Sequence, residues 1–143
     1  MRLQSHRGGP PLRVLLAGCP GPASAALAVW VGEQSGATVA GPATVAAAAS
    51  RLAETFQPHV VLLDFHGLPV STAATVAFLK KLAPPPVVVV LTHDASEAMR
   101  RRCREAHVDA VFDKTSELEA VARLLQDTQK SLVRLPSTVP LRS

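Results

Sequence analysis

The chain has 143 residues, the size of one ordinary domain, and only 3% of them are aromatic, so Ala, Val and Leu must fill its core. No apolar run reaches the roughly 20 residues that span a bilayer, and the basic N-terminal stretch has no apolar segment of signal-peptide length. The two cysteines, Cys19 and Cys103, are too few for a disulfide framework or a zinc site. These features argue against a membrane or secreted protein and predict a cytoplasmic one with reduced thiols.

The net charge of +4 and the pI of about 9.7 raise the question of nucleic-acid binding. The basic residues are only partly clustered, in a group made of Arg100, Arg101, Arg102 and Arg104. Such a cluster is more often a solvated helix face than a binding surface. No set of base-stacking aromatic residues accompanies it, so nucleic acid is not the expected partner.

Short apolar runs alternate with helix-like stretches along the chain. In chain order, the first half is expected to form a strand at 13–17, a helix at 23–35, a weak strand at 38–40, a helix at 44–56 and a strand at 59–63. The second half is expected to form a helix at 71–82, a strand at 87–91, a helix ending at 104, a strand at 110–112 and a helix ending at 129. Asp94 or Ser96 can cap the fourth helix, and Ser116 can cap the fifth in a capping box with Glu119.

Continuous apolar strands that alternate with helices predict a parallel sheet covered on both faces. We therefore expect one α/β domain at 12–129, preceded by a disordered basic head at 1–11. The segment 130–143 contains Pro136 and Pro140 and shows no helical period, so it is expected to be a flexible tail.

Parallel sheets carry their functional groups at the carboxyl ends of the strands. Asp64 ends the third predicted strand, Thr92 ends the fourth and Lys114 follows the fifth. Each of these residues alone is commonly a turn, a cap or a solvated side chain. Together they favour a phosphoryl site, in which the carboxylate is the nucleophile and the hydroxyl and ammonium groups bind phosphoryl oxygens.

The spacing of these residues is similar to that of a known family. Asp64 is followed by Phe65, His66, Gly67, Leu68 and Pro69, while Thr92 comes 28 residues after Asp64 and Lys114 comes 22 residues after Thr92. On these residues the chain resembles the receiver domains of response regulators over nearly the whole predicted domain. The resemblance implies a flavodoxin-like (βα)5 three-layer sandwich, whose five-stranded parallel sheet has the strand order 2-1-3-4-5.

The resemblance also implies a function in two-component phosphorelay signalling. Asp64 would accept a phosphoryl group from a histidine kinase or a histidine phosphotransfer protein, and Thr92 and Lys114 would bind its oxygens. Asp64 and the backbone carbonyl of His66 would ligate Mg²⁺. The protein would then act by protein–protein contact, without an enzymatic output of its own.

The chain departs from the family pattern in two respects. Receivers carry an acid pair after the first strand, where this chain has Gly18 and Cys19. Because Mg²⁺ requires oxygen ligands, its binding is expected to be weak or absent. Receivers also often have Tyr or Phe three residues before the conserved Lys, where this chain has Val111. The neighbouring Phe112 should point to the opposite face of the sheet.

The resemblance places the partner surface on the fourth and fifth helices and the fifth strand. Candidate residues on this surface are Arg100, Arg101, Arg104 and Val111. A basic surface of this kind suits an acidic partner, and the resemblance also allows a homodimer through the fourth and fifth helices.

Two alternative functions remain open. In the first, the chain keeps the receiver fold only as a phosphorylation-independent interaction module, since the acid pair is missing. A hypothesis from another class is a small phosphatase or phosphocarrier that uses Cys19, because a thiolate at a strand-to-helix turn can be activated by the helix N-terminus. The phosphatase loop needs Arg six residues after the Cys, however, and this chain has Ala25 there.

Overall fold

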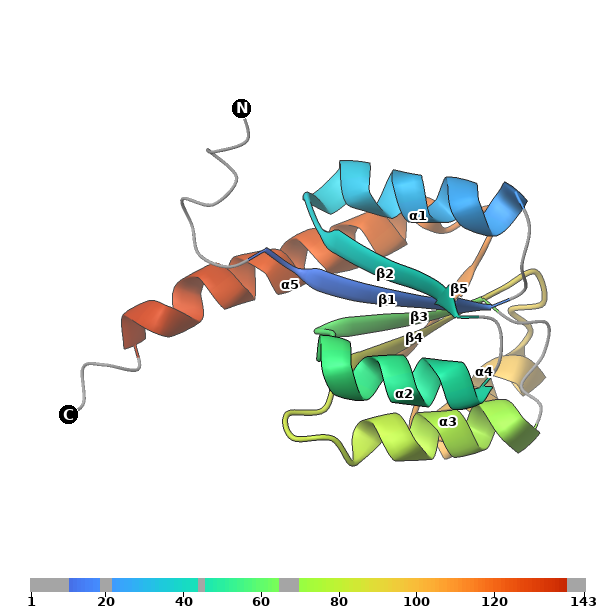
Figure 1. The fold of residues 1–143 in the computed structure, drawn as a ribbon. Coiled ribbons are helices and arrows are strands. Elements are labelled where there is room, and N and C mark those ends of the chain that lie inside the picture. Colours follow the sequence, from blue (N-terminus) through green and yellow to red (C-terminus); the bar gives the residue numbers. More distant parts are fainter. Residues whose placement is uncertain (1–10, 19–21, 44–45, 65–69, 139–143) are drawn as a thin grey trace.

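The computed structural model describes residues 11–18, 22–43, 46–64 and 70–138. Its five strands pair in parallel in one sheet with the order β2-β1-β3-β4-β5, as Figure 1 shows. The strands are β1 (Arg13–Gly18), β2 (Thr38–Ala43), β3 (Val60–Asp64), β4 (Val87–Thr92) and β5 (Ala110–Asp113). The helices are α1 (Pro22–Ser35), α2 (Ala46–Phe56), α3 (Val70–Lys80), α4 (Glu97–Glu105) and α5 (Leu118–Thr138). The predicted flavodoxin-like fold and its strand order are confirmed.

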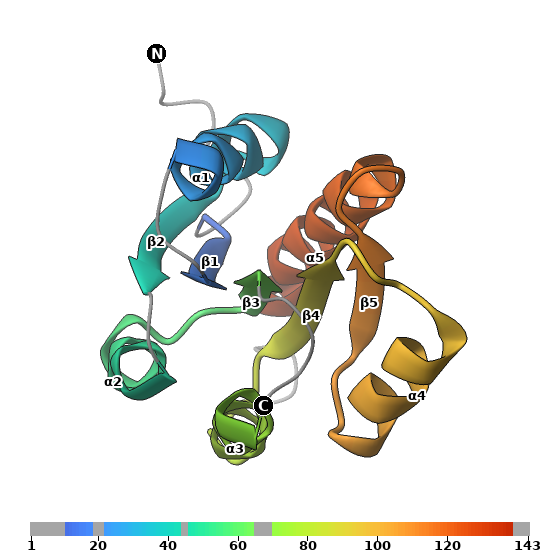
Figure 2. The same ribbon diagram turned by 90° about the vertical axis from the view of Figure 1, so that its right-hand side faces the viewer.

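The sheet is covered on both faces, with α1 and α5 on one side and α2, α3 and α4 on the other (Figure 2). Successive strand residues point to opposite faces. In β3, Val60 and Leu62 pack toward α1 and α5, whereas Val61 and Leu63 pack toward α2, α3 and α4. All four are fully buried, which explains why the strands read as continuous apolar runs.

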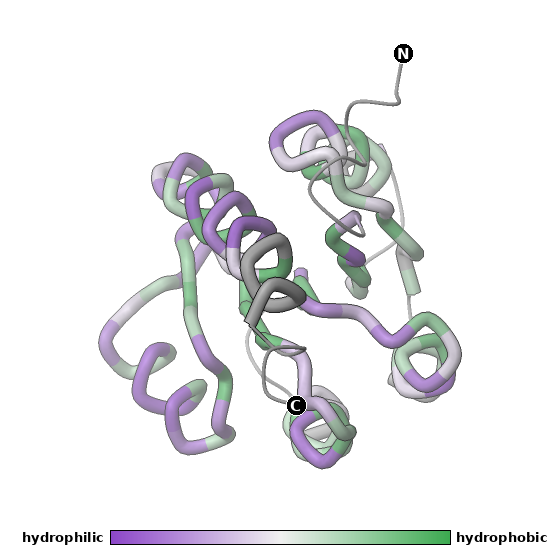
Figure 3. Tube along the Cα trace, turned by 90° about the vertical axis from the view of Figure 1, so that its left-hand side faces the viewer, coloured by the Kyte–Doolittle hydropathy of each residue, from purple (hydrophilic) through white to green (hydrophobic). Residues whose placement is uncertain are grey.

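The helices differ in polarity, as the hydropathy colours of Figure 3 show. Helix α4 is largely hydrophilic and buries only Met99 and Cys103. It begins at the cap Ser96, whose side chain accepts a hydrogen bond from the backbone N–H of Met99 at 3.2 Å. Of the two caps considered from the sequence, Ser96 is therefore the one used. No helix in the described ranges combines the length and the apolarity that crossing a membrane requires.

Two predicted boundaries are wrong. Helix α5 continues to Thr138 instead of ending at residue 129. Leu132 extends the apolar stripe of Val121 and Leu125 by two further turns and packs against the same core cluster. Strand β2 also runs three residues beyond the predicted 38–40. The predicted head lies almost wholly outside the described residues, as does the segment 139–143.

The amino-terminal ends of β1 and β3 are tied together by Arg13 and His59. The backbone N–H of Arg13 donates to Nδ1 of His59 at 2.9 Å, and the backbone N–H of His59 donates to the carbonyl of Arg13 at 2.8 Å. Because Nδ1 accepts a hydrogen bond, the imidazole must be neutral. Burial, together with the charge of Arg13, lowers the pKa of His59 below its ordinary value.

We expect this histidine to make folding stability depend on pH. The unfolded chain binds the His59 proton more readily than the folded chain, so stability is complete above the ordinary histidine pKa of about 6.5 and falls as the pH drops below it. In His59→Asn, the amide oxygen can replace Nδ1 as acceptor without titrating. Urea denaturation from about pH 7.5 to about pH 5 should show a shallower loss of stability in this variant than in the wild type.

His107→Asn is the matched control. His107 is exposed and has a φ of 69°, a left-handed conformation that Asn tolerates well. This variant should keep the pH dependence of the wild type. Equal slopes for the wild type and His59→Asn would contradict the role assigned to His59.

Candidate functional site

The candidate site is centred on an ion pair at the carboxyl edge of the sheet. Asp64 ends β3 and is only 7% exposed. The Nζ of Lys114, just after β5, lies 2.6 Å from Oδ1 of Asp64. Strand alternation turns Asp64 to the same face as Leu62, and Lys114 to the same face as Phe112. The two charges therefore meet on the face covered by α1 and α5.

Thr92 ends β4, the strand between β3 and β5, and is 2% exposed. Its hydroxyl oxygen accepts a hydrogen bond from the backbone N–H of Asp94 at 2.9 Å. Its carbonyl accepts one from the backbone N–H of Lys114, also at 2.9 Å. The structure thus places Asp64, Thr92 and Lys114 at adjacent strand ends.

The turn that carries Lys114 is held by two acidic residues that the sequence analysis missed. Oδ1 of Asp113 accepts hydrogen bonds from the backbone N–H and the hydroxyl of Thr115 at 2.8 and 2.6 Å, and from the backbone N–H of Ser116 at 3.2 Å. These bonds lower the pKa of Asp113 to about 2. Oε1 of Glu117 accepts from the backbone N–H of Asp113 at 2.8 Å. An Asp two residues before a Thr is a turn signal that could have been recognised.

This arrangement also changes the predicted start of the last helix. The backbone N–H of Ser116 is bonded to Asp113, and α5 begins at Leu118. The carbonyl of Glu117 accepts from the backbone N–H groups of Ala120 and Val121 at 3.0 and 3.2 Å. Glu117 therefore precedes the first helical residue, and the structure does not show the capping box predicted for Ser116 and Glu119.

A pocket of about 340 Å³ opens beside the ion pair. Apart from Asp64 and Lys114, the described residues that line it are apolar: Ala26, Leu27, Trp30, Leu91 and Leu118. The first three of these come from α1, and Trp30 is the only tryptophan of the chain. The helix predicted at 23–35 contains Trp30, but nothing in the sequence indicates that this helix faces Asp64.

Gly18 lies where β1 comes closest to β3. A Cβ atom at this position would lie 2.8 Å from Cβ of Asp64 and closer still to the carbonyl oxygen of Asp64. Residue 18 is paired with Asp64 in the register of the two strands. No side chain fits here without a shift of the backbone. The first position of the missing acid pair is therefore sterically closed as well as lacking a carboxylate.

The described residues do not fit a Mg²⁺ site. Within the described ranges, no three side chains of His, Cys, Asp or Glu are grouped so that they could hold a metal ion. Asp64 offers one carboxylate, and its Oδ1 already contacts Lys114. Mg²⁺ requires several oxygen ligands in octahedral geometry. Cys19 and His66, the remaining residues considered for this site, lie outside the described residues.

The four residues predicted on a partner surface differ in exposure. Arg101 and Arg104 are exposed, and Arg104 lies 3.5 Å from Glu97 in an ion pair. Arg100 is half-buried and bonds within the domain, to the carbonyl of Val111 at 2.9 Å and to Glu117 at 3.1 Å. The side chain of Val111 packs against the core beneath α4. Only Arg101 and Arg104 are thus readily available to a partner.

The strand order 2-1-3-4-5, with Asp64 and Thr92 at strand ends and Lys114 beside them, defines the class of the protein: it has the fold of response-regulator receiver domains. No protein-family model and no curated protein matches the chain.

Solved structures support this fold. The signal receiver domain of the response regulator NarL from Mycobacterium tuberculosis is 22% identical, with a TM-score of 0.69 over 84% of this chain and 97% of that one. A DNA-binding response regulator of the LuxR family from Staphylococcus aureus is 18% identical, with a TM-score of 0.70 over 82% and 98%. A pilus assembly-related protein from Burkholderia pseudomallei is 23% identical, with a TM-score of 0.68 over 85% and 89%.

We expect the two partners of the ion pair to differ in their effect on stability. Lys114→Met leaves a buried carboxylate without its cation and should lower the free energy of unfolding by about 2 kcal/mol. Asp64→Asn leaves an ammonium group that is 24% exposed and can reach water, so its cost should stay below about 1 kcal/mol. Urea denaturation of both variants and of the double variant measures the coupling. Strictly additive effects would show that the ion pair contributes nothing.

The close packing of Gly18 gives a second prediction. Gly18→Ala should lower the free energy of unfolding by about 2 kcal/mol, because the added methyl group meets the backbone of Asp64. Gly32→Ala is the matched control in α1, since its Cβ would lie 3.8 Å from the nearest atom. That change should stabilise the helix by about 0.5–1 kcal/mol. Thermal and urea denaturation check both, and a Gly18→Ala variant as stable as the wild type would contradict the steric argument.

Proposed function

We propose that this protein is a cytoplasmic signalling receiver that accepts a phosphoryl group on Asp64 from a histidine kinase or a histidine phosphotransfer protein. The observation that carries the proposal is the buried ion pair of Asp64 and Lys114, beside Thr92 at the next strand end. The receiver fold supports it. The protein would signal by contact with partners, and the exposed Arg101 and Arg104 are the residues we propose for an acidic partner or for a second copy of the chain.

The geometry suggests how the transfer would proceed. Oδ1 of Asp64 is bonded to Lys114, which leaves Oδ2 as the nucleophile. Oδ2 attacks the phosphorus of a phosphohistidine, the P–N bond breaks, and the electron pair leaves with the imidazole. The product is an acyl phosphate on Asp64. The Lys114 ammonium group would offset part of its negative charge, and the Thr92 hydroxyl can donate to a phosphoryl oxygen.

The pocket beside Asp64 would affect the lifetime of this acyl phosphate. The described side chains of its walls, apart from Asp64 and Lys114, are apolar and come from α1, β4 and α5. Such walls offer few hydrogen-bonding groups to position a hydrolytic water. No step of the transfer is assigned to a metal, because no three possible ligand side chains are grouped within the described ranges and residue 18 has no room for a carboxylate. The structural neighbour Rcp1 was solved with Mn²⁺ bound. We therefore expect this chain to differ from Rcp1 in its binding of a divalent metal.

A phosphorylation-independent interaction module is the second candidate function. The lack of space for a side chain at Gly18 favours this function, because no carboxylate can stand there to bind a metal. Weak metal binding removes much of the driving force for phosphoryl transfer. The fold also occurs in pilus assembly proteins from Burkholderia pseudomallei and Burkholderia thailandensis. The Cys19-dependent phosphatase or phosphocarrier remains a separate hypothesis, and alkylation of Cys19 would abolish that activity and leave a receiver unaffected.

The direct test is phosphorylation by phosphoramidate, a small donor with a P–N bond, followed by intact mass. We expect a gain of one phosphoryl group in the wild type, with little change when Mg²⁺ is added. Asp64→Asn should gain none, whereas Asp94→Asn, which alters an exposed carboxylate close to Thr92, should react like the wild type. Trp30 lines the same pocket as Asp64, so its fluorescence should change with the mass.

The other outcomes are equally informative. A strictly Mg²⁺-dependent adduct would contradict the inference that the metal site is lost. The absence of any adduct, both with phosphoramidate and with a panel of phosphorylated histidine phosphotransfer proteins, would reject phosphorylation and leave the interaction module.

A further inference from the structure

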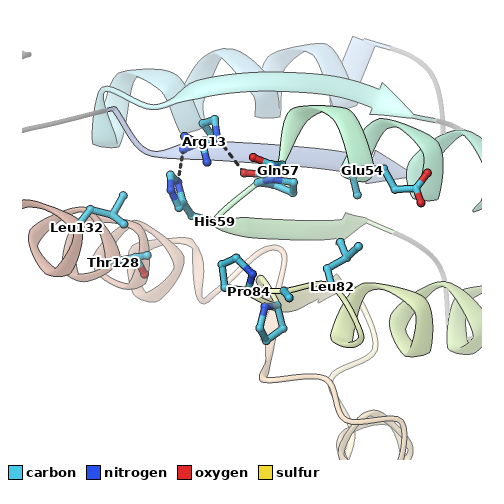
Figure 4. Close-up of a pocket in the computed structure, with 12 residues that line it drawn as sticks. Arg13, Glu54, Gln57, His59, Leu82, Pro84, Thr128 and Leu132 are labelled. Carbon is cyan, nitrogen blue, oxygen red and sulfur yellow. Dashed lines mark hydrogen bonds between the residues drawn. The ribbon is translucent and has the colours of Figure 1, made fainter. Parts of the chain in front are cut away.

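A second pocket lies at the opposite edge of the sheet, at the amino-terminal ends of β1 and β3 (Figure 4). Its volume of about 360 Å³ is in the range of small-molecule sites. It is bordered by the end of α2, the segment before β4 and one face of α5. None of its lining residues belongs to the site around Asp64.

Among the described residues that line the pocket, the one permanently charged cation is the guanidinium of Arg13. Its Nε donates to the carbonyls of Phe56 and Gln57 at 3.1 and 2.9 Å, where α2 ends. None of the ion pairs found in the described ranges involves Arg13, so its two terminal amino groups lack a carboxylate partner there. A guanidinium whose terminal amino groups have no carboxylate partner among the described residues is suited to binding a planar carboxylate.

His59 adds a neutral donor. Its Nδ1 accepts the hydrogen bond from the Arg13 backbone, so the ring proton is on Nε2. Figure 4 shows the ring of His59 beside Arg13, with Thr128 and Leu132 of α5 on one side. His59 can therefore donate a hydrogen bond without adding a second positive charge.

The remaining walls are mainly apolar and include Pro58, Leu82, Pro84, Pro85 and Leu132. Glu54 also lines the pocket, and in Figure 4 its carboxylate points away from Arg13. A single cation next to an acidic residue is a poor match for a phosphate dianion or a nucleotide, and one carboxylate is too few for a metal. The combination fits an organic anion with one negative charge and an apolar body.

We propose that this pocket binds a small monocarboxylic acid, whose carboxylate pairs with Arg13 and accepts a hydrogen bond from His59, while its hydrocarbon part packs against Leu82, Pro84 and Leu132. The mainly apolar lining and the small volume favour a free acid over a protein segment. This site is independent of phosphoryl transfer at Asp64, so the test of one does not decide the other.

The test is an NMR titration of the full ¹⁵N-labelled chain with hexanoate, hexanamide and acetate. Hexanoate should shift the amide signals of residues 57, 59, 82, 128 and 132 in a saturable manner. Hexanamide lacks the charge and acetate lacks the apolar body, so each should bind about tenfold more weakly.

Three variants sharpen the test. Arg13→Gln should weaken hexanoate binding about tenfold, whereas Glu54→Gln removes a nearby negative charge and should strengthen it about twofold. Glu33→Gln, in α1, removes an exposed carboxylate that does not line the pocket and should leave the affinity unchanged. If Arg13→Gln does not fold, the amide comparison and Glu54→Gln still decide the question.

Three results would overturn the proposal. Equal affinities for hexanoate and hexanamide would remove the role of the charge. A lack of saturable shifts with hexanoate would remove the site. Binding of acetyl-Ala-Leu without binding of hexanoate would show that the pocket takes the carboxyl end of a protein partner instead.

Discussion

The carboxylate of Asp64 is buried at the end of β3, and the surrounding structure supplies the cation that it requires. Lys114 can supply it only because the turn after β5 is fixed. Asp113 bonds the backbone of that turn, Glu117 bonds the backbone of Asp113, and Arg100 of α4 bonds both Glu117 and the carbonyl of Val111. One arginine of the basic helix is thus part of the support of the site. The charge of α4 is therefore not all available to a partner.

The approach of β1 to β3 sets the second constraint. Since Gly18 leaves no room for a side chain, the charges described at the site are one carboxylate and one ammonium group. Phosphorylation of Asp64 would add negative charge that Lys114 alone cannot neutralise. The acyl phosphate of this protein should therefore be less stabilised than one formed next to a metal. A partner that brings its own cations to this edge of the sheet would favour the phosphorylated state.

The sequence predicts those features of the fold that depend on the periodicity of apolar residues and on the order of strands and helices. Apolar strands alternating with helices predict the parallel sheet, and the rule that parallel strands end at one edge places Asp64, Thr92 and Lys114 together. Features that depend on particular side chains could not be predicted in this way. Helix α5 continues past residue 129 because Leu132 packs against the core. Pro136 and Pro140, which follow it, led to the prediction of an earlier helix end. Likewise, Arg13 and His59 form a hydrogen bond although they are 46 residues apart in the sequence, so no local sequence pattern predicts this contact.

Strands β1 and β3 connect the two pockets of the molecule. Their register runs without interruption from Val14 and Val60 to Gly18 and Asp64, and the residues between these pairs are buried. A packed strand pair of this kind moves as a unit, because its side chains have no space to rearrange separately. A ligand that only fills the pocket beside Arg13 would therefore leave Asp64 unchanged. Coupling between the two ends requires a second conformation of the strand pair, to which the ligand binds more tightly than to the one described. An example is a conformation in which Arg13 no longer donates to the carbonyls at the end of α2.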